Sequence, residues 1–236
     1  MPSSEPGRYA GSVWRFVEDQ NLSSTMKLVD GTADQATLEA LLDETKPPVP
    51  EDCAHLHYLM FTPFRYPART ATRYRPAGER RGVFYAAEAV ATAAAEVAFY
   101  RLLFFLESPE TVPPERPFEM TAFRVRLNVE RAVDLRRETP ERVVELSDPV
   151  DYAPCHALAA EARTGGVGAI RYPSVRTRGW NVALLDCAGF AGVRPTALEG
   201  WWFRFSGRGL FAVKRFGEGR LDFPVEMFAG DPRVRG

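Results

Sequence analysis

The sequence lacks several features by which broad classes of protein are recognised. Its 236 residues include only three cysteines, Cys53, Cys155 and Cys187. They are odd in number and far apart, they form no CxxC pair, and no signal peptide precedes them. Proteins with so few, unpaired cysteines are typical of a reducing compartment, so we expect a cytoplasmic protein.

Histidine is equally scarce, which bears on metal binding. The three histidines are His55, His57 and His156, and none of them stands at zinc-finger spacing from a cysteine pair. Structural zinc sites need four closely grouped thiolate or imidazole ligands. We therefore expect no metal site.

The chain also lacks an excess of charge and a long apolar run. Thirty basic residues face 31 acidic ones, which gives a net charge of −1. Such a balance offers no general attraction to nucleic acid or to an anionic membrane, so any anion site must be local. No apolar run approaches the roughly 18 residues of a membrane span, so we expect neither nucleic acid nor membrane as a partner.

Common nucleotide-binding and hydrolase motifs are missing as well. No GxGxxG follows a strand and opens a helix, and there is no Walker sequence. These absences disfavour the dinucleotide-binding and P-loop folds. No GxSxG surrounds any serine, which disfavours a serine hydrolase of the nucleophile-elbow type.

What is present is enough apolar sequence for one substantial core, at 45% hydrophobic residues. Residues 1–11 have no periodicity and are expected to form a tail, and Asp34 is expected to cap a short helix that runs to Leu42. The proline cluster of residues 46–50 ends that helix. We predict a single domain, residues 51–236, with residues 1–50 as an N-terminal extension packed on it.

Strand-like segments outnumber helical ones. Strands are predicted at Trp14–Val17, Gly82–Tyr85, Phe123–Val129, Ala132–Leu135, Ala169–Tyr172 and Trp180–Leu185, with a closing hairpin over residues 201–216. The piece at Ala132–Leu135 is expected to pair beside the strand before it. A helix starts near Pro154 and is closed by Gly165-Gly166, and the tail beyond Gly217 is weakly patterned. The class is α+β, with mixed or antiparallel sheets and flanking helices.

The most distinctive segment is an alanine-rich helix of about twenty residues that follows the strand at Tyr85. Eight of the thirteen residues from Ala86 to Ala98 are alanine, so the helix can lie very close to a sheet. Glu96 is an isolated acid among small and aromatic helical neighbours. A carboxylate there needs a partner or a ligand. Either it pairs with an internal arginine, or it is a functional group.

A second candidate segment is the turn after the strand at Ala169–Tyr172. Ser174 lies where a hydroxyl and several backbone N–H groups can face one point, which suits a phosphate or an amide. The serine can equally satisfy only its own turn. Arg171, Arg176 and Arg178 either form a solvated basic turn or clamp a pyrophosphate, since arginine binds phosphate oxygens bidentately.

These residues together resemble the RES domain family, bacterial toxins of toxin–antitoxin modules named for an arginine, a glutamate and a serine. The resemblance covers about residues 65 to 190. The matching residues are Arg73-Tyr74, Tyr85-Ala86-Ala87, Glu96, Gly168-Ala169-Ile170-Arg171-Tyr172-Pro173-Ser174-Val175-Arg176 and Gly179-Trp180-Asn181. The N-terminal part, with Ser24-Thr25 and Lys46-Pro47, is similar to the ParT-like branch of that family.

The resemblance implies a fold similar to diphtheria-toxin-type ADP-ribosyltransferases, with NAD as substrate. It implies a toxin that mono-ADP-ribosylates a host protein of the phosphoribosyl pyrophosphate synthetase type, and a cognate helix-turn-helix antitoxin as partner. Two other functions stay open. One is an NAD phosphorylase or hydrolase that depletes cellular NAD, and the other is a noncatalytic binding module.

The same resemblance implies the site residues. The expected catalytic residues are Glu96, Arg73, Tyr85 and Ser174, and the expected NAD-binding residues are Arg65, Tyr74, Arg171, Tyr172, Arg176 and Asn181. The spacing from Arg73 to Tyr85 is slightly longer than in compact members of the family, so Arg65 or Arg15 can take the role of Arg73. A carboxylate such as Glu96 can stabilise the positive charge that develops on the ribose when the nicotinamide bond breaks.

Overall fold

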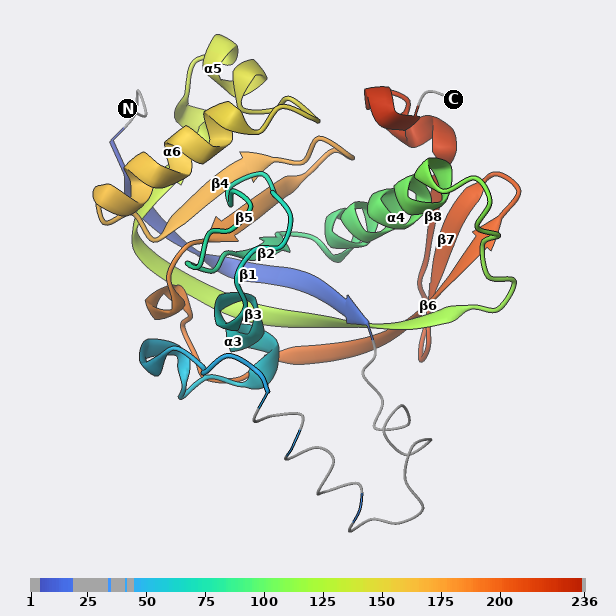
Figure 1. Ribbon diagram of the computed structural model, residues 1–236, viewed down its shortest axis with the longest axis horizontal. Helices are drawn as coiled ribbons and strands as arrows, with labels where there is room; N and C mark the ends of the chain where they lie inside the picture. The colour runs from blue at the N-terminus through green and yellow to red at the C-terminus, as the bar shows by residue number, and fades with distance from the viewer. Residues whose placement is uncertain (1–4, 19–33, 35–40, 42–44, 235–236) are drawn as a thin grey trace.

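One long strand, β3 (Phe118–Asp134), is the central element of the molecule. In the computed structural model, residues 5–18, 34, 41 and 45–234 are described. They form an α+β fold built on one eight-stranded mixed sheet, which confirms the predicted class (Figure 1). The short helix predicted from Asp34 to Leu42 lies almost wholly outside the described residues.

The remaining elements are seven strands, four helices and five single turns in the described residues. The other strands are β1 (Gly7–Glu18), β2 (Phe84–Ala87), β4 (Ala169–Pro173), β5 (Trp180–Leu184), β6 (Ala197–Ser206), β7 (Gly209–Lys214) and β8 (Arg220–Pro224). The helices are α3 (Tyr58–Arg65), α4 (Val90–Glu107), α5 (Pro140–Glu145) and α6 (Ala153–Thr164). Single turns of 3₁₀-helix are η1 (Glu51–Cys53), η2 (Leu135–Arg137), η3 (Cys187–Gly189), η4 (Val225–Phe228) and η5 (Pro232–Val234).

The sheet order is β1-β2-β5-β4-β3-β6-β7-β8, and β1 also pairs with β3. Five strands therefore form a closed ring of pairings, β1-β2-β5-β4-β3-β1. Only β3 and β4 pair in parallel; the other named pairs are antiparallel. In Figure 1, α5 and α6 lie on one side of this ring, α3 lies on the opposite side, and α4 runs toward the hairpin strands β6–β8.

The length of β3 explains why two predicted strands are one. Its side chains at Phe123, Val125, Leu127 and Val129 are buried while those at positions 126, 128 and 130 are exposed, which confirms the predicted alternation. The prediction that Ala132–Leu135 pairs beside this strand was wrong. The strand continues through Asp134, and its last residues pair with β4 from Ala132↔Ala169 onward.

Helix α4 packs as closely as its alanines allow. Ala94, Ala95 and Ala98 have no exposed surface, and they share a core cluster with Phe203 and Leu210 of the β6–β7 hairpin. A side chain no larger than a methyl group lets the helix axis approach the sheet. The predicted alanine-rich helix is thereby confirmed, although it begins at Val90, after a short link from β2.

Helix α6 is also as predicted. A proline occupies its first turn, where a missing N–H costs nothing, and the helix ends at Thr164. Gly166 follows with φ +67°, a left-handed conformation that glycine adopts without strain.

The prediction of an N-terminal tail was wrong, and the weakly patterned C-terminal segment contains structure that was not predicted. Residues 7–11 belong to β1 rather than to a tail, because they pair with β3 residues such as Leu127 and Asn128. The segment beyond Gly217 contains β8, which pairs with β7, and the turns η4 and η5. None of the helices in the described residues combines the length and apolar character needed to cross a membrane.

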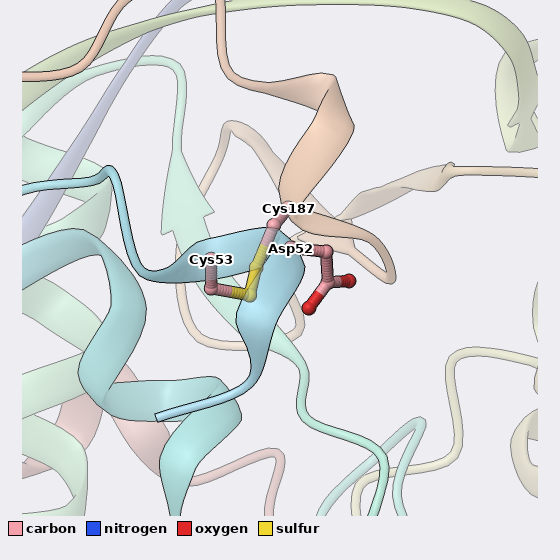
Figure 2. A group of neighbouring side chains, drawn as sticks. All are labelled: Asp52, Cys53 and Cys187. Atoms are coloured by element: carbon pink, nitrogen blue, oxygen red, sulfur yellow. A yellow bond between two sulfur atoms is a disulfide. The ribbon is translucent and has the colours of Figure 1, made fainter. Parts of the chain in front are cut away.

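A disulfide joins Cys53 of η1 to Cys187 of η3 across 134 residues of sequence, and Cys155 is a buried free thiol. Cysteine number and spacing did not predict this pairing. Figure 2 shows the Asp52 carboxylate beside the bonded sulfurs. These three side chains are the one group of possible metal ligands found in the part of the chain that the structure describes. Because the two sulfurs are bonded to each other, neither is a free thiolate in this form.

Candidate active site

A cavity of about 770 Å³ opens between β1, β2, β5 and α4. It is lined from β1 by residues 14–18, from β2 by residues 85–87, and from α4 by a face that includes Glu96 and Tyr100. Tyr172, Asn181, Thr72 and Arg73 complete much of the wall. Its volume lies in the usual range for small-molecule and cofactor sites, roughly 300–1,000 Å³.

The carboxylate of Glu96 is held at this cavity by two hydrogen bonds. Ser174 Oγ donates to Glu96 Oε1 at 2.8 Å, and Asn181 Nδ2 donates to the same oxygen at 2.7 Å. Neither donor contacts Oε2. The structure thus brings together three residues that are far apart in sequence, and it leaves the second carboxylate oxygen unengaged by either of them.

No arginine among the described residues pairs with Glu96, so the alternative of an internal ion pair is not what the structure contains. The partners of the carboxylate are a hydroxyl and an amide. Hydrogen bonds of this kind fix the orientation of a carboxylate without neutralising its charge. A fixed negative charge at the wall of a cavity is suited to stabilise positive charge on a ligand.

The turn between β4 and β5 sets the position of Ser174. Its Oγ accepts the backbone N–H groups of Arg176 at 3.2 Å and Thr177 at 3.3 Å, and its own N–H donates to the Gly179 carbonyl at 2.9 Å. The serine therefore satisfies its own turn and also donates its hydroxyl proton to Glu96. The two interpretations from sequence, turn former and site residue, describe the same geometry.

Asn181 lies on β5 and is only 3% exposed. Its Nδ2 is used by Glu96, but its Oδ1 is buried and has no hydrogen-bond partner among the described residues. A buried acceptor without a partner costs about 1–3 kcal/mol. A ligand that donates a hydrogen bond in the cavity would remove that cost.

Arg15 of β1 supplies a cation to the cavity wall. Its Nη1 donates to the Tyr85 carbonyl at 2.7 Å, and its guanidinium lies 5.3 Å from the centre of the Phe84 ring. Burial lowers the pKa of Arg15 to about 10, so it remains charged near neutrality. Its Nε is buried without a partner, and no carboxylate of the described residues pairs with it.

Arg73 also lines the cavity, but its guanidinium is anchored. Its Nη1 donates to the Leu146 carbonyl at 2.9 Å, and the group lies over the Tyr152 ring at 5.0 Å. Only 8% of the residue is exposed. The structure therefore places both Arg73 and its sequence-based alternative Arg15 at the same cavity. Arg15 is the one with a buried Nε that has no partner among the described residues.

Two tyrosine rings form part of the wall. The Tyr85 hydroxyl accepts the Tyr74 backbone N–H and shares a hydrogen bond with Thr72 Oγ1, both at 2.9 Å. Burial raises the pKa of Tyr85 to about 12, and burial likewise raises the pKa of Tyr172. Both phenols are therefore neutral near pH 7, and Tyr85 offers the cavity its ring rather than an ionised oxygen.

Three residues expected to bind NAD lie elsewhere. Tyr74 is a core residue, 1% exposed, with its ring 4.9 Å from that of Tyr172. The Nε of Arg65 donates to the Pro47 carbonyl at 2.5 Å, which holds this residue on the α3 side of the molecule. Arg171 points to the opposite face of β4 from Tyr172, because successive residues of a strand alternate.

Arg171 is also fully engaged there. It makes two hydrogen bonds to Glu88, at 2.7 and 2.6 Å, and a longer contact of 3.3 Å to Asp134. Arg176 does line the cavity, but it forms a buried ion pair with Asp231. The pyrophosphate clamp considered for the arginines of this turn is therefore not formed by Arg171 or Arg176 in this structure.

Sequence reasoning did not single out Tyr100 or Phe104 as parts of the site. Both line the cavity, and they follow Glu96 at four and eight residues along α4. That spacing places them on one face of a helix, which is the signal that could have found them. Arg101, at the same rim, pairs with Glu18 of β1.

The chain resembles known proteins in sequence and in structure. The model of the RES domain matches residues 49–206. No curated protein matches. Among solved structures, a chain of the M. tuberculosis MbcT-MbcA toxin-antitoxin complex is similar, with a TM-score of 0.45, 12% identity, and coverage of 78% of each chain.

Proposed function

The chain belongs to the RES domain family, and on that premise we propose that it is the NAD-consuming toxin of a bacterial toxin–antitoxin pair. The observation that carries the proposal is the Glu96 carboxylate, held by Ser174 and Asn181 at the wall of a cavity of nucleotide size. The matched residues, 49–206, include all three. The family resemblance and this geometry together support the proposal that these three residues take part in the reaction.

The cavity wall suits NAD group by group. The rings of Tyr85 and Tyr172 offer apolar surfaces for the nicotinamide or adenine. Arg15 offers an uncompensated cation for the pyrophosphate. The unpartnered Oδ1 of Asn181 accepts from a ribose hydroxyl or from the nicotinamide amide.

In the proposed reaction the bond between the ribose C1′ and the nicotinamide nitrogen breaks. Its electron pair goes to the nitrogen, and nicotinamide leaves as a neutral molecule. Positive charge develops on the ribose carbon and ring oxygen, and the fixed negative charge of Glu96 stabilises it. A nucleophile then bonds to C1′, and its proton passes to the solvent. Ser174 and Asn181 act by orienting the carboxylate.

For the nucleophile, we propose a side chain of a host protein, of the phosphoribosyl pyrophosphate synthetase type that the ParT-like resemblance implies. The support is that β1, part of the N-terminal segment carrying that resemblance, contributes Trp14 through Glu18 to the cavity wall. Strand β1 is therefore close enough to the site to help position an acceptor. Phosphate and water are the competing acceptors, and each gives a different product.

The test is to incubate the purified chain with NAD and to quantify nicotinamide and the fate of ADP-ribose. Nicotinamide release with one ADP-ribose added to a discrete lysate protein, seen by mass spectrometry, supports transfer. Release that requires inorganic phosphate and yields ADP-ribose 1″-phosphate identifies a phosphorylase, and free ADP-ribose identifies a hydrolase. NAD binding with no nicotinamide under any of these conditions would leave a noncatalytic binding module.

The cognate antitoxin is proposed to act by covering the cavity. Arg15 and Arg73 place positive charge at the wall, which would attract an acidic or carboxylate-ended segment of the partner. Arg65 lies outside the cavity lining and Arg176 is paired with Asp231, so these two arginines are not part of the proposed attraction. A complex in which NAD still binds with unchanged affinity would contradict this mode of inhibition.

A further inference from the structure

We propose that the C-terminal segment, residues 225–234, is a clamp that positions the catalytic turn, and that Asp231 is a positioning residue acting through Arg176 on Ser174 and Glu96. This segment lies outside the residues that match the RES domain, 49–206. The kinetic consequence of the clamp rests on the proposed function, whereas its effect on the turn does not.

The ion pair at the centre of the clamp is buried. The side chains of Arg176 and Asp231 are each 2% exposed, and Arg176 Nη1 donates to Asp231 Oδ2. The Arg176 guanidinium also lies 3.5 Å from the centre of the Phe99 ring. Arg176 is therefore held between an acid from the C-terminal segment and an aromatic side chain of α4.

A short chain of contacts leads from this ion pair to the proposed catalytic carboxylate. The backbone N–H of Arg176 donates to Ser174 Oγ at 3.2 Å, and Ser174 Oγ donates to Glu96 Oε1 at 2.8 Å. Phe99 is on the same helix as Glu96, one turn later. The arginine therefore ties the turn carrying Ser174 to the helix carrying Glu96.

The C-terminal segment has its own anchors. Arg233 donates to Asp231 through Nε at 2.9 Å and to the Pro149 carbonyl through Nη2 at 3.0 Å. The Phe228 ring meets the Phe99 ring edge to face at 5.5 Å. In Figure 1 these C-terminal turns lie beside α4. The position of Asp231 is thus fixed by contacts other than its ion pair with Arg176.

The physical chemistry favours a positioning role. A buried ion pair adds little net stability compared with apolar side chains of the same shape, but it strongly penalises arrangements that leave one charge alone. Arg176 also keeps a buried Nε that has no partner among the described residues, so the burial of this guanidinium does not maximise stability. The pair instead favours one position of the Ser174 turn, because other positions would leave a buried charge without its partner.

The test compares Asp231→Asn with a matched control, Asp222→Asn. Asp222 is also in the C-terminal region, but it pairs with Arg220 at 2.7 Å with both side chains more than half exposed. At a temperature where circular dichroism shows every protein folded, we expect Asp231→Asn to lower kcat for nicotinamide release roughly ten- to a hundredfold, as for a displaced catalytic geometry. Its KM for NAD should stay within about twofold, and Asp222→Asn should match the wild type.

A second readout does not depend on NAD chemistry. Hydrogen–deuterium exchange of the peptide covering residues 173–178 should be faster in Asp231→Asn and unchanged in Asp222→Asn. If the wild type releases no nicotinamide, the proposed function fails while this readout still tests the clamp. If Asp231→Asn does not fold, Asp231→Glu replaces it, since it keeps the charge but shifts it, and a smaller effect in the same direction is expected.

Two results would overturn the clamp. One is a melting temperature lowered by Asp231→Asn with wild-type kcat per folded molecule, which is the behaviour of a purely stabilising residue. The other is unchanged exchange across residues 173–178 in a variant whose ion pair is lost.

Discussion

At the scale of single residues, the two hydrogen bonds to one oxygen of Glu96 define the site. Ser174 and Asn181 both donate to Oε1, so the carboxylate has a fixed orientation. We expect Glu96→Gln to retain the fold and NAD binding, and to lose about 2–4 kcal/mol of transition-state stabilisation, because the amide has the same shape without the charge. Nicotinamide release and calorimetric NAD binding measure the two effects. Glu107→Gln, an exposed change on the same helix, is the control.

Near-wild-type turnover in a folded Glu96→Gln protein would remove the carboxylate from the chemistry. It would leave Glu96 as a structural partner of the turn.

Removing the hydroxyl of Ser174 should affect both the turn and the carboxylate. Ser174→Ala leaves the N–H groups of Arg176 and Thr177 without their acceptor and Glu96 with one donor fewer. We expect a loss of about 1–3 kcal/mol in unfolding free energy, together with a lower kcat. Urea titration and nicotinamide release check the two parts. Unchanged stability would mean that water replaces the hydroxyl in the turn.

The pKa of Asp231 predicts how the stability of the protein changes as the pH falls. Burial raises this pKa, but hydrogen bonds from Arg233 and Arg176 outweigh burial and hold it at about 2. A carboxyl whose pKa is lowered on folding contributes stability above its unfolded value, near 4, and loses it as pH falls toward 2. Asp231→Asn should therefore be less stable than the wild type by about 2 kcal/mol at pH 6, and the difference should shrink between about pH 4 and 2.

Melting temperatures across that pH range are the measurement. A difference between the two proteins that stays constant down to pH 2 would show that the charge of Asp231 is not what stabilises the segment.

At the scale of elements, the close approach of α4 to the β4–β5 turn can be tested at a glycine. A Cβ added at Gly179 would lie 2.3 Å from Thr92 Oγ1 on α4. Gly179→Ala should therefore push the turn away from the helix and weaken the contacts of Ser174 with Glu96, with a cost of about 1–3 kcal/mol. Gly207→Ala is the control, because nothing lies within 4 Å of its added Cβ.

Thermal unfolding and nicotinamide release should fall together for Gly179→Ala. If stability falls while turnover per folded molecule is unchanged, the approach of turn and helix is a matter of packing alone.

Elements whose adjacent residues carry a clear pattern were predictable from the sequence. Elements that form only by pairing with a distant strand were not. The alternation of β3, the alanines of α4 and the glycines after α6 each carry their structure in adjacent residues. The first half of β1 and all of β8 have no such pattern, because they become strands by pairing with β3 and β7. Tertiary pairing of this kind overrides weak local propensity.

The same distinction applies to the site. Glu96, Ser174 and Asn181 were found because a family pattern links them, although 78 residues separate the first two. The engagement of Arg176 by Asp231, 55 residues later, has no sequence signal. The orientation of Arg171 toward Glu88 and away from the cavity has no sequence signal either, because an arginine beside the Ser174 turn suits either face of the strand.

At the scale of the whole molecule, the Cys53–Cys187 disulfide closes a loop of 134 residues. Chain-entropy arguments give such a loop closure a stabilisation of up to about 5 kcal/mol. We expect a thiol reductant to lower the urea midpoint of the wild type. The double variant Cys53→Ser, Cys187→Ser should show the lower midpoint in both conditions, and Cys155→Ser should keep the response to reductant. Midpoints that do not depend on reductant would mean that the bond does not form in solution.

The ring of strand pairings also sets the order in which the molecule can be made. Strand β1 leaves the ribosome early, but its partner residues, Met120 to Ala132 of β3, are translated about a hundred residues later, which takes on the order of ten seconds at bacterial rates. Until then β1 has no long partner, and the cavity lacks the wall that carries Arg15. Ser174 and Asn181 emerge later still. A nascent chain therefore has no complete candidate site, and under the proposed function it cannot consume NAD before its synthesis is nearly finished.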